Sequence, residues 1–79
     1  MRNRKKHNAA VGEKINKLKK EKERLEIEFY AKSRALSDSQ IYRDEETVMT
    51  YGRRLKEIEK RSADIDEEIK KLESELISL

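Results

Sequence analysis

The chain has 79 residues, of which 47% are charged and 34% hydrophobic, with no proline and no cysteine. This composition differs from that of an ordinary globular domain and is typical of long helices and coiled coils. It excludes a disulfide framework and a thiolate metal site, and so short a chain has no room for a deep core.

The formal net charge of +3 is unevenly distributed. Residues 1–24 hold ten Lys and Arg against three Glu, whereas residues 25–79 hold ten basic residues against fourteen acids. The N-terminal third is therefore the basic part of the chain. No segment approaches the run of about eighteen apolar residues that a candidate membrane span needs. The sequence predicts a soluble, cytoplasmic protein with no membrane partner.

Residues 1–8 are strongly basic, and we expect them to form a flexible lead-in. They resemble the positive end of a signal peptide, but Gly12, Glu13 and Lys14 stand where an apolar run would have to follow.

Residues 9–36 are predicted to form the first helix of a coiled coil. Alternating spacings of three and four keep one stripe of the helix facing a partner helix, and we call this stripe the seam. Two seam positions are lysines, which we expect to fix the register while their ammonium groups reach solvent. The predicted seam positions are Val11, Ile15, Leu18, Lys22, Leu25, Phe29, Lys32 and Leu36.

Residues 37–44 are predicted to reverse the chain. Their serines and aspartates compete for backbone hydrogen bonds and so favour turns and caps. Asp44 is the expected N-cap of the next helix, and Glu45 and Glu46 bring negative charge to its first turn, where the helix dipole favours it. Because so short a connection cannot lead back to the starting end of the first helix, the two helices must run antiparallel.

Residues 45–79 are predicted to form the second helix, whose seam is more regular. Its positions are Val48, Tyr51, Leu55, Ile58, Ser62, Ile65, Ile69, Leu72, Leu76 and Leu79. The predicted fold is therefore all-α, a two-helix antiparallel coiled-coil hairpin over residues 9–79. One register sets Phe29 opposite Tyr51, and a shift by one heptad is the alternative.

No motif for catalysis or cofactor binding is present. The two glycines are far apart and cannot form a phosphate-binding loop, and His7 has no cysteine or second histidine with which to share a metal. The serines have no histidine base in either predicted helix. We therefore expect a protein that is not an enzyme and that binds no cofactor and no metal.

Basic residues on the first helix and around the turn are the candidates for a binding surface. Cations attract phosphate through a salt-dependent electrostatic interaction, and tyrosines can stack on exposed bases. The alternative is that acids of the second helix neutralise the lysines, so that these charges only solvate the hairpin. The predicted nucleic-acid-binding residues are Lys14, Lys17, Lys19, Lys20, Tyr30, Lys32, Arg34, Tyr42, Arg43, Arg53 and Arg54.

The stretch from Leu25 to Glu46 resembles the tip of the C-terminal coiled-coil domain of the ABC-F ATPases, Uup-type proteins included. In that family a Leu- and Glu-rich helix is followed by an aspartate, a short turn with a tyrosine and an acidic start to a second helix, as at Asp38, Tyr42 and Asp44. The chain departs from the family in having Ser39 where proline is common and in lacking a tryptophan near the end of the second helix.

This resemblance implies that the hairpin is a fragment of a longer ATP-binding protein, with the ATPase modules of that chain as partners. It also implies DNA binding by the domain and ribosome association of the parent protein, with ribosomal RNA as a second possible ligand. The C-terminal arm of valyl-tRNA synthetase is a similar-looking hairpin that binds RNA. The functional alternative is a protein-interaction or oligomerisation hairpin, for example a homodimer, with no affinity for nucleic acid.

Overall fold

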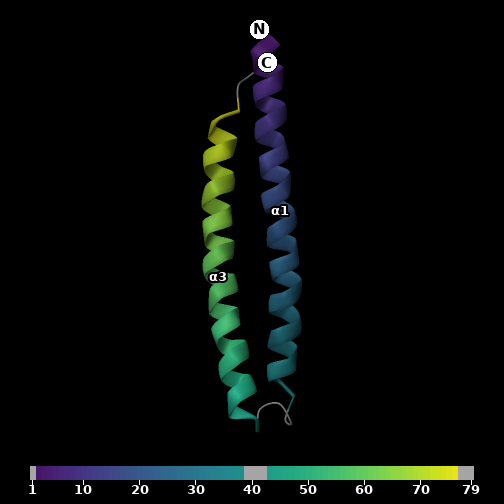
Figure 1. The fold of residues 1–79 in the computed structure, drawn as a ribbon, viewed down its shortest axis with the longest axis vertical. Helices are drawn as coiled ribbons and strands as arrows, with labels where there is room; N and C mark the ends of the chain where they lie inside the picture. Colours follow the sequence, from purple (N-terminus) through teal and green to yellow (C-terminus); the bar gives the residue numbers. More distant parts are fainter. Residues whose placement is uncertain (1, 39–42, 77–79) are drawn as a thin grey trace.

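The computed structural model of the chain describes residues 2–38 and 43–76, except for the side chains of residues 2 and 3. It contains two helices, α1 (Arg2–Leu36) and α3 (Glu45–Ser74), and no β-strand in the described residues. The helices lie side by side and run in opposite directions, forming a rod of 62 × 15 × 13 Å (Figure 1). The predicted all-α, two-helix antiparallel hairpin is confirmed.

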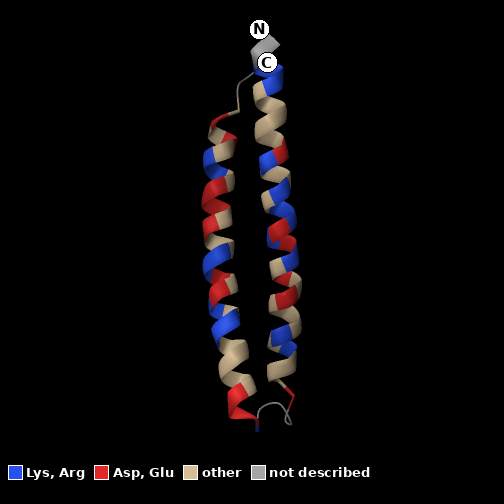
Figure 2. Ribbon diagram, in the orientation of Figure 1, with Lys and Arg blue, Asp and Glu red and all other residues tan. Residues whose placement is uncertain are grey.

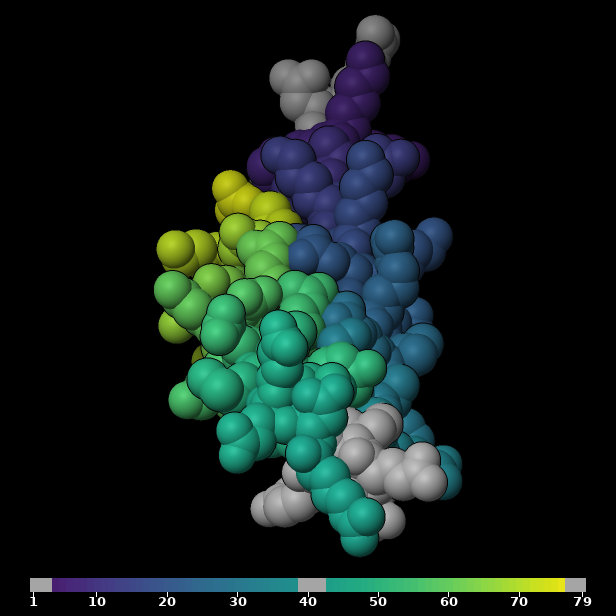
Figure 3. Space-filling model, turned by 60° about the horizontal axis from the view of Figure 1, so that its bottom comes forward, coloured from purple at the N-terminus to yellow at the C-terminus, as the bar shows by residue number. Residues whose placement is uncertain are grey.

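The core of the hairpin is the predicted seam. Val11, Ile15, Ile58 and Ile65 are its buried hydrophobic residues, and Ile65 has 0% of its surface exposed. The other described seam residues are half-buried, except Leu76, which is 43% exposed, and Leu79 lies outside the described residues. Side chains of α1 and α3 meet along the rod in the space-filling view (Figure 3). One stripe per helix is a narrow core, and we expect the modest stability typical of chains this short.

Helix α1 begins at Arg2, so the first helix starts seven residues before its predicted start at residue 9. Lysine and arginine have high helix propensity. The basic segment before the first seam residue can therefore extend α1 without contributing a seam residue of its own. In addition, His7 Nε2 donates a hydrogen bond to the carbonyl oxygen of Glu75 at 2.7 Å, which joins the start of α1 to the end of α3.

Helix α3 ends at Ser74, five residues before the predicted end at residue 79. The hydroxyl of Ser74 donates to the carbonyl oxygen of Lys71 at 2.6 Å, the acceptor that the N–H of Glu75 would use in a continuing helix. The Glu75 N–H instead donates to the carbonyl oxygen of Leu72 at 3.0 Å, in a tighter turn. Competition by the Ser74 hydroxyl for this carbonyl therefore explains why α3 ends before its predicted end. Residues 77–79 lie outside the described residues.

The described parts of the connection agree with the predicted reversal. After α1, the N–H groups of Ser37 and Asp38 each donate to a carbonyl three residues earlier, at 3.0 Å. Asp44 has extended backbone (φ −93°, ψ 95°), and its carboxylate accepts hydrogen bonds from the Thr47 N–H at 3.3 Å and the Thr47 hydroxyl at 2.8 Å. These bonds lower the pKa of Asp44. Asp44 is therefore the N-cap of α3, as predicted; residues 39–42 lie outside the described residues.

Both glycines lie inside helices, and this gives a prediction. Gly12 and Gly52 have no positive φ, and apart from its sequence neighbours and the adjacent backbone of its own helix, a β-carbon built on either would meet no described atom within 4 Å. Because glycine is about 1 kcal/mol less favourable than alanine in a helix, we expect Gly12→Ala and Gly52→Ala to stabilise the hairpin by about that amount each. Urea unfolding followed by circular dichroism tests this, and a destabilised double variant would contradict it.

Candidate nucleic-acid interface

The lysines of α1 form the most accessible group of predicted binding residues. Lys14, Lys17, Lys19 and Lys20 are all exposed. None of their ammonium groups makes an ion pair with a residue that the structure describes. Figure 2 shows basic residues at intervals along both halves of α1. These four cations are therefore available to an external anion.

Among the described residues, the α1 cation that pairs with an acid of α3 is a different lysine, Lys22. The seam residue Lys22 reaches out of the seam, and its Nζ lies 2.6 Å from Oδ1 of Asp66. The hydrogen bond from this ammonium to Asp66 raises the pKa of Lys22. Lys22 is half-buried and its ammonium pairs with an exposed carboxylate, in keeping with the expectation that a seam lysine extends its charge to the surface. This exposed pair contributes little to stability.

A shallow groove of about 690 Å³ lies between the helices at the end opposite the turn. Its floor includes Leu18 and Leu72, and Lys14, Lys17 and Lys71 stand at its edges. Glu68 and Glu75 also line it, so it is not uniformly basic. Lys71 is not among the predicted binding residues, because only the folded hairpin brings this residue of α3 beside the lysines of α1.

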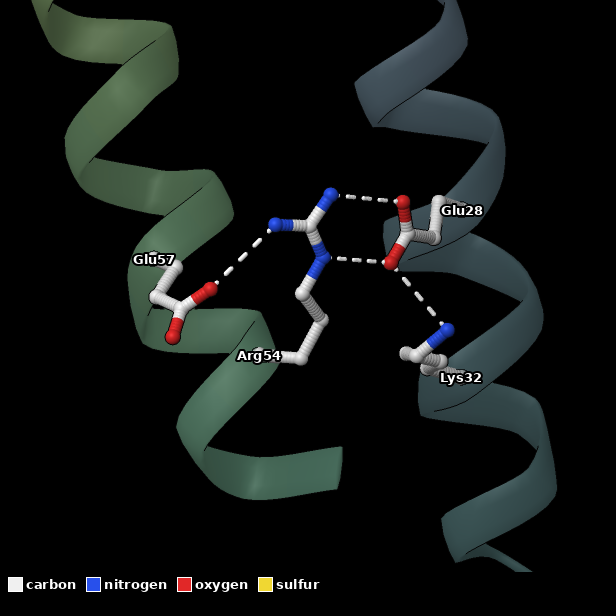
Figure 4. Close-up of polar contacts among 4 residues, drawn as sticks. All are labelled: Glu28, Lys32, Arg54 and Glu57. Carbon is white, nitrogen blue, oxygen red and sulfur yellow. Dashed lines mark hydrogen bonds and ion pairs between the residues drawn. The ribbon is translucent and has the colours of Figure 1, made fainter. Parts of the chain in front are cut away.

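Near the turn, the carboxylate of Glu28 holds two of the predicted cations (Figure 4). Arg54 donates from Nε to Oε2 at 2.6 Å and from Nη2 to Oε1 at 2.9 Å, which is a bidentate pair across the two helices. Lys32 Nζ lies 3.1 Å from Oε2 of the same carboxylate, and Arg54 Nη1 donates to Glu57 at 3.2 Å.

These contacts change the charge that Arg54 and Lys32 present to a ligand. The hydrogen bonds from Arg54 and then Lys32 lower the pKa of Glu28 to about 2. The same carboxylate, together with Glu57, raises the pKa of Arg54. Lys32 Nζ also lies 5.4 Å from the ring centroid of Tyr51, the ring that one predicted register sets opposite Phe29. A phosphate group would have to compete with Glu28 for both cations.

The remaining predicted residues are spread over both helices near the turn. Arg34 lies with Cζ 5.8 Å from the ring centroid of Tyr30, and Tyr30 is 64% exposed. Arg43 and Arg53 are exposed and make no ion pair with a described residue. Tyr42 lies outside the described residues. The structure thus separates the predicted site into a group of exposed lysines on α1, a neutralised cluster at Glu28, an exposed Tyr30–Arg34 pair and the exposed Arg43 and Arg53.

Two cross-helix ion pairs lie in a row that was not predicted. Glu28 with Arg54 and Glu21 with Arg61 are seven residues apart on each helix, and each member directly precedes a seam position. Arg61 Nε lies 2.6 Å from Oε2 of Glu21 and lowers the pKa of that carboxylate. The signal was present in the sequence, because residues flanking a seam are where interhelical ion pairs form.

The pairing at Glu28 predicts acid sensitivity. In the unfolded chain this carboxyl has its ordinary pKa of 4.5, whereas in the hairpin the pKa is about 2. Between these values the unfolded state binds more protons, so stability is full above about pH 4.5 and is lost as the pH falls through about 2. We expect the thermal midpoint to decrease over this interval, and to decrease less steeply in Glu28→Gln. Glu23 is an exposed glutamate of the same helix, and Glu23→Gln is the control. Equal slopes of the thermal midpoint against pH in the two variants would contradict the prediction.

Comparison with known proteins identifies no relative. No protein-family model matches the chain, and no curated protein or solved structure is significantly similar to it. The relationship to ABC-F C-terminal domains therefore stays a prediction.

Two further features bear on the kind of site. Among the described residues, no group of three or more His, Asp or Glu side chains could hold a metal ion. Neither helix, over its described length, has an apolar stretch that would cross a membrane.

Proposed function

We propose that the hairpin is a non-catalytic module that binds nucleic acid through the lysines of α1. The observation that carries this proposal is that Lys14, Lys17, Lys19 and Lys20 are exposed and make no ion pair with a described residue, although α3 presents many acids. Four exposed cations within about two turns of one helix suit a phosphate backbone, which offers a negative charge at every nucleotide. The ligand is DNA or ribosomal RNA, and phosphate contacts do not distinguish them.

The test is a fluorescence anisotropy titration of the intact chain with a labelled duplex at several salt concentrations. Each phosphate contact adds about 0.9 to the slope of log K against log salt, so four contacts give a slope of about −4. Absence of binding at low salt would remove the proposal.

A protein-interaction hairpin is the second candidate, and one observation favours it. Leu18 and Leu72 form an apolar groove floor at the end opposite the turn, and Leu76 is 43% exposed there. A second copy could cover this surface in a homodimer. Analytical ultracentrifugation distinguishes the two: a concentration-dependent dimer that does not bind nucleic acid would favour this reading.

The ABC-F resemblance adds partners that the hairpin itself does not reveal. If the parent chain carries ATPase modules, the hairpin acts as their nucleic-acid-binding appendage and the parent protein associates with the ribosome in the cytoplasm. Copurification of the full-length parent protein with ribosomes, compared with a version lacking the hairpin, tests this part of the proposal.

A further inference from the structure

Tyr30 is an exposed aromatic residue that the hairpin does not use for folding. Its side chain lies outside the seam, and the residue is 64% exposed, whereas the seam tyrosine Tyr51 is half-buried. Ile27, three residues earlier, is 69% exposed. Residues three apart are neighbours on a helix surface. Tyr30 and Ile27 therefore form an outward apolar patch on α1.

This patch lies between cations on the same helix. Arg34 lies one turn beyond Tyr30, with Cζ 5.8 Å from the ring centroid, and is itself exposed. Lys20 precedes Ile27 by seven residues, nearly two full turns, and so lies on the same outward face. At 1.5 Å per residue, Lys20 and Tyr30 are about 15 Å apart along the axis, which is a span of a few nucleotides.

We infer that Tyr30 is a stacking platform for an unpaired base, so that the hairpin binds single-stranded nucleic acid in addition to duplex. This inference rests on the proposed function. An exposed aromatic ring flanked by cations that contact phosphates is the combination by which proteins bind single strands. The paired bases of a duplex offer no free face to such a ring. Stacking on Tyr30 therefore adds affinity only for single-stranded nucleic acid.

The chain allows a direct test because it contains no tryptophan. Oligothymidylate and a duplex of the same length are titrated into the wild-type chain, Tyr30→Ala, Tyr30→Phe and Ile27→Ala. We expect Tyr30→Ala to weaken oligothymidylate binding about five-fold or more and to leave duplex binding little changed. Tyr30→Phe retains the ring and should bind as the wild type does. Tyr30→Trp supplies a single indole whose emission should be quenched by oligothymidylate, whereas Tyr51→Trp, in the seam, should not respond.

The possible failures are distinguishable. If both nucleic acids bind but Tyr30→Ala binds oligothymidylate as tightly as the wild type does, the stacking role is overturned and the proposed function stands. If Ile27→Ala loses as much affinity for oligothymidylate as Tyr30→Ala does, the patch makes a general apolar contact, and this result would also overturn stacking. If Tyr30→Ala instead abolishes self-association in the ultracentrifuge, the patch is a protein contact. If the wild type binds neither nucleic acid at low salt, the proposed function itself fails.

Discussion

Replacing Ile65 with alanine is expected to leave the hairpin largely unfolded at room temperature. Ile65 is the most deeply buried of the described residues, with 0% of its surface exposed, and lies in the C-terminal half of α3. Ile→Ala in a core costs about 2–5 kcal/mol, and chains this short rarely gain more than about 3–5 kcal/mol from one core. Because the core is one residue wide on each helix, neighbouring side chains cannot close the cavity.

Ile27→Ala is the matched control for this prediction. It removes the same atoms from a residue that is 69% exposed, so we expect a change within about 0.5 kcal/mol. Helix content at 222 nm, followed through thermal and urea unfolding, separates the two variants. Equal losses of stability would mean that the seam is not the core.

Replacing three lysines of α1 with glutamine should remove most of the nucleic-acid affinity without changing the fold. Lys17, Lys19 and Lys20 are exposed and outside the seam. From the slope expected of four contacts, the wild type should lose about 100-fold in affinity between about 50 and 200 mM salt. The triple variant should bind weakly even at low salt, and its slope should be smaller by about 3.

A control variant with the same loss of charge on the other helix tests whether nucleic-acid affinity depends on where the lysines lie. Lys56, Lys60 and Lys70 of α3 are also exposed lysines, and their triple substitution with glutamine reduces the net charge equally. We expect this control to bind nearly as tightly as the wild type does. If both triple variants lose affinity equally, binding reflects net charge alone and the lysines of α1 are not the interface.

The pattern of flanking charges explains why one register is preferred. The row that contains Glu21 and Glu28 on α1 continues to Lys14 and, one heptad earlier, to His7. On α3 the row runs from Arg54 through Arg61 to Glu68 and Glu75, and its two cross-helix ion pairs join Glu28 to Arg54 and Glu21 to Arg61. Lys14 and Glu68 line the same groove, in keeping with this order. A slip by one heptad would set Glu21 beside Glu68 or Lys14 beside Arg61, and the repulsion opposes both alternatives.

The sequence by itself determined the hairpin. The spacing of Ile58 and Ile65 with the rest of the seam predicts a helix with one apolar stripe, and the serines and aspartates before Glu45 predict where it starts. These are local rules, because a helix period and an N-cap depend on residues within a few positions of one another. Where local signals were weak, at residues 1–8 and beyond Ser74, the predicted boundaries failed.

Only the tertiary structure decided which charges remain available. From the sequence, Lys20 and Arg54 were equivalent candidates, since each is a basic residue on a predicted helix. Folding sets Arg54 beside Glu28, which lies 26 residues away in the chain, and leaves Lys20 exposed and without an ion pair to a described residue. Electrostatic pairing depends on distance in space, and the distance between two helices is fixed by their register and not by the composition of either one.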